Sequence, residues 1–414
     1  MTVFDHSQPV PSSSDSHSLN QQNPTSPSVN LPNTNLSSSY QHSITGPTIQ
    51  LHDTGLKEEL LMLVQSEDIE VLNRARSSNS RFLSLDQRQS PLFPLYASIY
   101  CSDTFPFIDL KDLEQQADVF AQQDPMTVEA LVSALYLYRC SRFFGNDSAG
   151  LKRRVLEVRC SHMMVDFERY LTQWAECGDL ISMDLLGSYF SRKNDETFAL
   201  YWWEEAKKSN FITSYCGAGT RYSRGYYDLR KDFIKGFAYN QEGVKLGDLG
   251  AMNDLSWYLR HGNCPGVAKN PGKAASLLSL AVLHGYVFGL YNLGFMVLDG
   301  DFGYTNEDLA HRFFEEGARH NCCSCMKMLI QREHPNKEHW IAEVNRLEVG
   351  KPPKPAKKKR VNTQQTSQSC PVQPRVATPL EPVQRPPLQV NNNPQDDVIK
   401  ALMEQRKRTK ANRK

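Results

Sequence analysis

The sequence has no apolar run of the roughly 18 residues that a membrane-spanning helix requires, so we expect no membrane contact. Its first 30 residues also lack a basic start followed by an apolar stretch, and we therefore expect no export signal. The 10 cysteines are irregularly spaced, and without export reduced thiols are expected rather than disulfides. These absences predict a cytoplasmic protein, or a nuclear one if the source has a nucleus.

Sequence motifs of common enzyme classes are missing as well. The chain has no GxSxG nucleophile motif, no HExxH zinc-protease motif and no phosphate-binding P-loop. GAG at residues 217–219 is not a dinucleotide-binding motif, because a third glycine does not follow at the required distance. We therefore predict a protein that is not an enzyme and that uses no cofactor.

Low-complexity segments flank the rest of the chain. Residues 1–54 are dominated by Ser, Asn, Gln and Pro, and residues 349–395 have a similar composition with added Lys. Neither segment has enough clustered apolar side chains to offset the entropy of a flexible chain, so both are predicted to be disordered. The folded part is expected at about residues 55–348, and a short basic helix at residues 396–414.

Positive charge is concentrated in the carboxyl-terminal tail. Residues 351–414 contain 15 basic and 4 acidic side chains, whereas the first 350 residues contain 32 basic and 42 acidic ones. A basic cluster in this tail, formed by Lys357, Lys358, Lys359 and Arg360, is typical of a nuclear-import signal, of contact with an acidic partner or of phosphate contacts in nucleic acid. A solvated tail without a partner is the alternative interpretation.

The central part of the chain contains an internal repeat of about 37 residues. Gly or Asn, which tolerate a left-handed helix end, recur at spacings of 37, 38 and 36 residues at Asn210, Gly247, Gly285 and Asn321. A helix-capping residue stands 15 positions before each of them, at Asp195, Asp232, Asn270 and Asn306. Each period therefore predicts a helical hairpin, and stacked hairpins share a core. The predicted fold is an all-α solenoid of helix-turn-helix repeats.

Small side chains recur on one side of these expected helices, with bulky ones such as Trp202 and Phe313 beside them. Small residues let two helices approach closely, and bulky neighbours fill the space around the contact. The repeat-defining small positions are Ser182, Gly187, Ala199, Ala206, Ser214, Gly219, Gly247, Ala251, Ala274, Ala281, Gly285, Gly289, Gly294, Ala310, Gly317 and Cys325.

This pattern resembles the Sel-one-like repeats, which are relatives of the tetratricopeptide repeats. The residues that carry the resemblance are the Leu-Gly and aromatic pairs, Leu186-Gly187, Trp202-Trp203, Leu293-Gly294 and Phe313-Phe314, with the spaced Ala and Gly positions. It covers about residues 178–333, and the unit at residues 210–247 matches least well because Gly replaces both Ala residues. We predict a scaffold or adaptor that binds a protein or peptide along the concave face. The alternative is a nucleic-acid-associated factor that contacts phosphates through its basic tail.

The stretch HNCCSC at residues 320–325 has two functional interpretations and one structural interpretation. Cys325 occupies a small repeat position, which predicts core packing. A zinc site would need Cys322, Cys325, His334 and His339, but their spacing is short for a zinc finger and there is no second Cys pair. A redox-sensitive thiol is the remaining alternative. The sequence therefore predicts packing and no metal.

Outside the repeat, residues 55–177 are expected to be helical, with helices at 56–65 and on both sides of a Gly-Asn-Asp turn within 127–160. Degenerate repeats are one interpretation of this region. Counting back from Gly178, Met163 and Phe167 stand where a cap and a small residue belong, so the repeat pattern fails there. Residues 337–349 alternate apolar and charged side chains in a way that suits a helix closing the solenoid.

Overall fold

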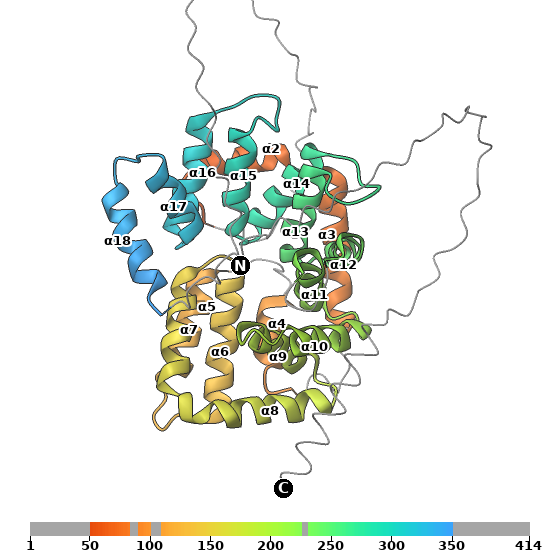
Figure 1. The fold of residues 1–414 in the computed structure, drawn as a ribbon, viewed down its shortest axis with the longest axis vertical. Coiled ribbons are helices and arrows are strands. Elements are labelled where there is room, and N and C mark those ends of the chain that lie inside the picture. Colours follow the sequence, from red (N-terminus) through yellow and green to blue (C-terminus); the bar gives the residue numbers. More distant parts are fainter. Residues whose placement is uncertain (1–49, 83–89, 101–108, 226–230, 351–414) are drawn as a thin grey trace, which may run out of the picture. The chain divides into compact units, whose positions relative to one another are not determined.

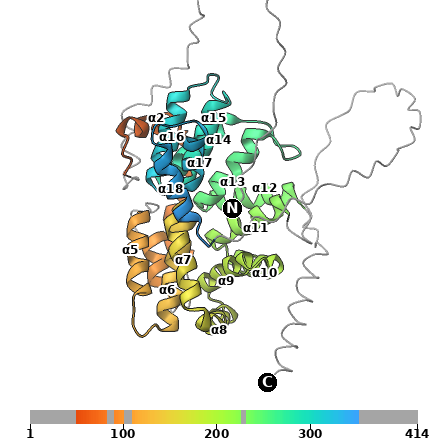
Figure 2. The ribbon, with the colours of Figure 1, turned by 60° about the vertical axis from the view of Figure 1, so that its left-hand side comes forward.

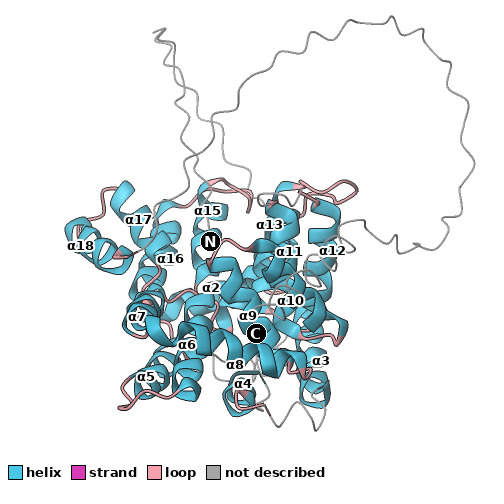
Figure 3. Cartoon of the chain, turned by 60° about the horizontal axis from the view of Figure 1, so that its bottom comes forward, coloured by secondary structure: helices cyan, strands magenta, loops and turns pink. Residues whose placement is uncertain are grey.

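The computed structural model describes residues 50–82, 90–100, 109–225 and 231–350. Every regular element in these ranges is a helix (Figures 1 and 3), which confirms the predicted all-α class. None of the described helices combines the length and the apolar character needed to cross a lipid bilayer. The predicted disordered segments and the predicted helix at 396–414 lie almost entirely outside the described residues.

Ten consecutive helices form five helical hairpins, which confirms the predicted solenoid. The hairpins are α8 (Met164–Glu176) with α9 (Leu180–Arg192), α10 (Glu196–Lys208) with α11 (Ile212–Arg224), α12 (Phe233–Lys245) with α13 (Leu249–His261), α14 (Pro271–Leu283) with α15 (Phe288–Leu298), and α16 (Glu307–Arg319) with α17 (Cys323–Gln331). Each hairpin has a first and a second helix in this order. The second helix also packs on the first helix of the next hairpin, so the core is continuous.

The turns and caps of the hairpins lie at the residues that the repeat predicts. The backbone is left-handed, with φ of 95°, 55°, 83°, 97° and 63°, at Gly178, Asn210, Gly247, Gly285 and Asn321. The four predicted capping side chains accept backbone N–H groups of Phe198, Lys235, Lys273 and Leu309 at 3.3, 2.9, 2.9 and 2.9 Å. Because these are local features, the repeat alone predicts them correctly.

The hairpins begin one helix earlier than the sequence pattern. Met163 offers no side-chain cap to α8, and a short 3-10 helix (Ser161–Met163) precedes that helix instead. Phe167 is fully buried where a small residue was expected, and its ring lies 5.3 Å from that of Tyr189 on α9. The repeat pattern is therefore lost at Met163 and Phe167, but α8 and α9 still pair as a hairpin, because the large side chain of Phe167 fills the space.

Within the residues that the structure describes, seven further helices precede or follow the hairpins (Figure 1). They are α2 (Thr54–Leu63), α3 (Ser66–Phe82), α4 (Phe93–Tyr100), α5 (Leu110–Ala121), α6 (Val128–Phe143), α7 (Asp147–Arg159) and α18 (Lys337–Glu348). The helices predicted at residues 56–65, within 127–160 and at 337–349 correspond to α2, to α6 with α7, and to α18. Figure 2 shows the end of α18 beside α7, where Arg154 Nη2 donates to the carbonyl oxygen of Leu347 at 2.7 Å.

A buried ion pair and its hydrogen-bond partners join α6 to the first two hairpins of the solenoid. Arg139 on α6 contacts Asp184 on α9, with Nη1 and Oδ2 2.8 Å apart. Trp203 Nε1 on α10 donates to the other oxygen of this carboxylate at 2.9 Å, and Arg139 Nε donates to Ser188 Oγ at 2.7 Å. Three helices therefore share one interior polar network.

Candidate interaction and metal-binding sites

The small repeat positions lie where helices approach each other closely. Fully buried examples are Ser182, Ala199, Ala206, Ser214, Ala251, Ala274, Ala281, Ala310 and Cys325. A Cβ atom added at Gly187, Gly219, Gly289 or Gly294 would lie 2.7, 2.9, 2.7 and 2.5 Å from Trp203, Asn240, Val282 and Phe314. Gly317 is in similarly close contact with Cys325, whereas Gly247 and Gly285 are the left-handed turn residues.

The unit that matches the repeat least well, at residues 210–247, also packs closely. A Cβ at Gly236 would lie 2.6 Å from Tyr258 Oη and 3.0 Å from the carbonyl oxygen of Gly219. A Cβ at Gly243 would lie 2.6 Å from the Cβ of Ala251. Glycine replaces alanine here because the neighbouring helices leave no room for a methyl group.

The three clustered cysteines are all buried at the start of α17. Cys322 is the residue before this helix, and its side chain caps no backbone amide. The cap comes instead from Asp147 at the start of α7, whose Oδ2 accepts the N–H of Cys323 at 3.0 Å. Asp147 N–H also donates to the carbonyl oxygen of Asn321 at 3.1 Å. Nothing in the repeat pattern could identify Asp147 as this cap.

The thiols of Cys322 and Cys325 interact with each other. The side-chain hydrogen bond between them lowers the pKa of Cys322, and burial raises the pKa of Cys325 well above its usual range. His334 is bound elsewhere, with Nε2 2.8 Å from Glu315 Oε1, and His339 is exposed against the ring of Trp340. Among the described residues, the side chains of Cys322, Cys325, His334 and His339 do not come together as one group of potential ligands.

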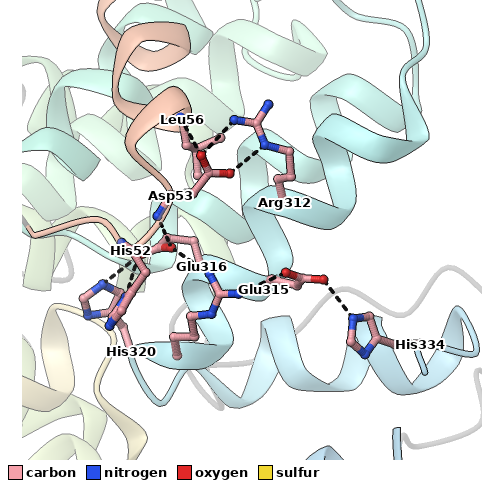
Figure 4. Close-up of polar contacts among 9 residues, drawn as sticks. His52, Asp53, Leu56, Arg312, Glu315, Glu316, His320 and His334 are labelled. Atoms are coloured by element: carbon pink, nitrogen blue, oxygen red, sulfur yellow. Dashed lines mark hydrogen bonds and ion pairs between the residues drawn. The ribbon is translucent and has the colours of Figure 1, made fainter. Parts of the chain in front are cut away.

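A different group of potential ligands does come together at α16 (Figure 4). Glu316 is fully buried, and its Oε1 lies 3.1 Å from His52 Nδ1 and 3.2 Å from His320 Nε2. The same oxygen accepts the backbone N–H of His52 at 2.9 Å, and Oε2 accepts that of Asp53 at 3.3 Å. Arg319 Nη1 lies 3.4 Å from Oε2. We call His52, Glu316 and His320 the His-Glu-His cluster.

Hydrogen bonding determines the charge of this buried carboxylate. Burial by itself would raise the pKa of Glu316, but hydrogen bonds from His320 and from the backbone and ring of His52 outweigh it and lower the pKa to about 2. The repeat pattern does not reveal this cluster, because His52 falls in the segment predicted to be disordered. A signal was present in the Glu316-x3-His320 spacing, which places both side chains on one helical face.

The part of the chain that contains His52 also binds to α12, α14 and α16, the first helices of the last three hairpins. We call residues 50–75 the N-terminal segment. Asp53 accepts from Arg312 Nε and Nη2 on α16 at 2.6 and 3.0 Å and also caps α2 through the N–H of Leu56 at 3.1 Å (Figure 4). Leu56 and Leu60 on α2 are fully buried. One aspartate therefore both starts α2 and anchors it.

Helix α3 continues this contact on α14 and α12. Ser276 Oγ on α14 accepts the N–H of Gln65 at 2.8 Å and donates to Asp68 Oδ2 at 2.5 Å. Lys273 Nζ lies 2.6 Å from Asp68 Oδ1 and 2.5 Å from Glu67 Oε1. Acidic side chains at the start of α3 are thus paired with cationic and hydroxyl groups of the solenoid.

The end of α6, the turn after it and the start of α7 cover the starts of three second helices, those of α13, α15 and α17. Phe143 contacts Gly250 at the start of α13. A Cβ at Gly145 would lie 2.9 Å from the backbone nitrogen of Phe288 at the start of α15. Together with the cap that Asp147 provides to α17, these contacts show that residues of the same chain occupy part of the surface that the second helices of the hairpins form. The basic cluster Lys357, Lys358, Lys359 and Arg360 lies outside the described residues.

No family model and no curated protein matches this sequence. Among solved structures, the chain is similar to a Sel1 repeat protein from Oxalobacter formigenes, with 14% identity over 57% of this chain and 99% of that chain and a TM-score of 0.38. It is also similar to c5321, a protective antigen of uropathogenic Escherichia coli strains displaying an SLR fold, with 14% identity over 67% and 71% of the two chains and a TM-score of 0.27. The chain's own hairpins, turns and caps, rather than these scores, identify it as a helical-repeat protein that resembles the Sel1-like repeat proteins.

Proposed function

We propose that this protein is a non-enzymatic protein-interaction scaffold. Its binding surface is formed by α12, α14 and α16, which we call the first-helix surface. The observation that supports this proposal is the docking of the chain's own N-terminal segment there, which lies on the outside of the repeat core and is not part of any hairpin.

The contacts of the N-terminal segment indicate the kind of partner that suits this surface. Arg312 and Lys273 pair with acidic residues that precede or begin α2 and α3. Leu56 and Leu60, four residues apart on one face of α2, supply the buried apolar contact. The partner is therefore an amphipathic helix with an acidic amino-terminal end and leucines spaced by four, which binds in place of the N-terminal segment.

A labelled peptide copy of residues 50–75 tests this proposal by fluorescence anisotropy against the full-length protein. The attached segment competes with the peptide at an effective concentration in the millimolar range. The double variant Leu56→Ala/Leu60→Ala weakens the attached segment, because each buried Leu→Ala change costs about 2–5 kcal/mol. We expect this variant to bind the peptide at least tenfold more tightly than the wild type.

A matched control is Glu58→Ala, which changes an exposed residue of the same helix and should leave the affinity at the wild-type value. Adding Lys273→Ala and Arg312→Ala to the leucine variant should abolish binding. Equal peptide affinity for the wild type and for the leucine variant, with helical content unchanged by circular dichroism, would contradict the proposal.

A further inference from the structure

We propose that the His-Glu-His cluster binds one divalent transition-metal ion, with zinc as the ion that fits it best. His52, Glu316 and His320 are the ligands from the protein, and the ion joins the start of the N-terminal segment to α16. This inference does not depend on the proposed scaffold function.

The arrangement of the ligand atoms supports this assignment. One nitrogen of each ring and one oxygen of Glu316 all lie within 4.8 Å of one another. Ligands held about 2.0–2.1 Å from a tetrahedral zinc ion are roughly 3.3 Å apart. The Glu316 Oε1 distances of 3.1 Å to His52 Nδ1 and 3.2 Å to His320 Nε2 are close to this value. An ion could therefore replace the hydrogen bonds within the cluster with little movement of the backbone.

The chemistry of the three groups selects among metals. Two imidazole nitrogens with one carboxylate oxygen suit zinc and similar transition metals, whereas calcium and magnesium require mainly oxygen ligands. Because the protein offers only three ligands, a water molecule would complete a tetrahedron. The side chain of His52 is 48% exposed, which provides a path from solvent to the cluster.

The groups around the ligands support the same assignment. The backbone N–H groups of His52 and Asp53 hold the two oxygens of Glu316 in place, as outer partners of metal-binding carboxylates commonly do. The two nearby cations are also paired with other carboxylates. Arg319 Nη2 lies 3.3 Å from Glu315 Oε2, and Arg312 binds Asp53. Their charge is therefore partly balanced before an ion enters.

Isothermal titration of the chelator-treated full-length protein with zinc chloride tests the proposal. We expect one zinc ion per chain, and a loss of affinity of at least tenfold in His52→Gln and in His320→Gln. His52 is half-exposed, so its replacement should leave the helices intact, and circular dichroism of each variant checks this.

The control is His334→Gln, which changes a histidine bound to Glu315 and belonging to the alternative ligand set with Cys322 and Cys325. It should bind zinc like the wild type. The proposal is overturned if the wild type binds no zinc, or if His52→Gln binds it with wild-type affinity. Loss of binding in His334→Gln with retention in His320→Gln would also overturn it, because the cysteines would then hold the ion.

Discussion

The helical hairpins at residues 164–331 and the helices that precede them are held together in different ways. Helices of the hairpins contact mainly their neighbours in sequence, through small residues packed against large ones such as Gly187 against Trp203. The preceding helices are fastened to distant parts of the chain by polar groups as well as by buried apolar side chains such as Leu56 and Leu60 on α2. Arg139 and Asp184 are 45 residues apart, and His52 and Glu316 are 264 residues apart. The first arrangement can be repeated, whereas each contact of the second occurs once.

This difference predicts different responses to substitution. In the hairpins, a substitution that adds an atom should be the most destabilising kind, because closely packed helices have no space for it. In the preceding helices, a substitution that removes one partner of an ion pair or hydrogen bond should be the most destabilising kind, because a buried charge or amide is then left unpaired.

The largest effect is expected from Asp184→Ala. This change leaves the buried guanidinium of Arg139 without its carboxylate and removes the acceptor of Trp203, so unfolding in urea should show a loss of about 3–5 kcal/mol. Glu168→Ala is the control, because its partner Lys193 is largely exposed and 3.8 Å away. That control should cost less than about 1 kcal/mol. Equal losses in the two variants would contradict the role of the buried pair.

The second effect depends on pH and concerns Glu316. Its folded-state pKa of about 2 lies below the ordinary value of 4.5. The carboxylate therefore stabilises the fold above pH 4.5, and this contribution disappears as the pH falls from 4.5 to 2. A shift of this size corresponds to about 3 kcal/mol. Urea unfolding of wild type and Glu316→Gln, in the presence of a chelator, should differ most at pH 7 and converge near pH 2. A difference that is constant with pH would be inconsistent with this account.

Within the hairpins, Gly294→Ala should cost about 2 kcal/mol, because its added methyl group would lie 2.5 Å from the Phe314 ring. Gly272→Ala is the matched change in a helix with space, since the nearest atom to its Cβ is Asn270 Oδ1 at 3.7 Å. Thermal unfolding should show a lower melting temperature for the first variant only. If both variants behave alike, close packing at Gly294 is not important for stability.

The smallest effect is expected at the point where the two regions meet. Asp147→Ala removes the cap of α17, which should cost about 1 kcal/mol, and it also removes an ion pair in which Arg142 Nη2 lies 3.1 Å from Asp147 Oδ1. Hydrogen exchange at the Cys323 amide, which depends on the cap, should become faster. Asp147→Asn retains an acceptor oxygen and should keep most of the protection. Unchanged exchange in Asp147→Ala would show that the cap is dispensable.

Local chemistry explains how much of the fold the sequence predicted. A left-handed turn at Asn210 or Gly247 and a cap at Asp232 or Asn306 depend on residues within a few positions of each other, so their spacing was enough. The same holds for Cys325, because the repeat register alone places it against the preceding helix. Where one large residue replaces a small one, as at Phe167, the register is lost although the helix is not.

The sequence by itself therefore determined the helical class, the hairpin period and the positions of turns, caps and small contacts, since each is set by conformational preferences within one unit. Only the tertiary structure decided where α2, α3 and α6 lie, that Asp147 caps α17, and that His52 joins Glu316 and His320. The polar contacts among them join single side chains across 45 to 264 residues of chain. No periodic pattern marks such groups, and their partners are defined only once the hairpins have stacked.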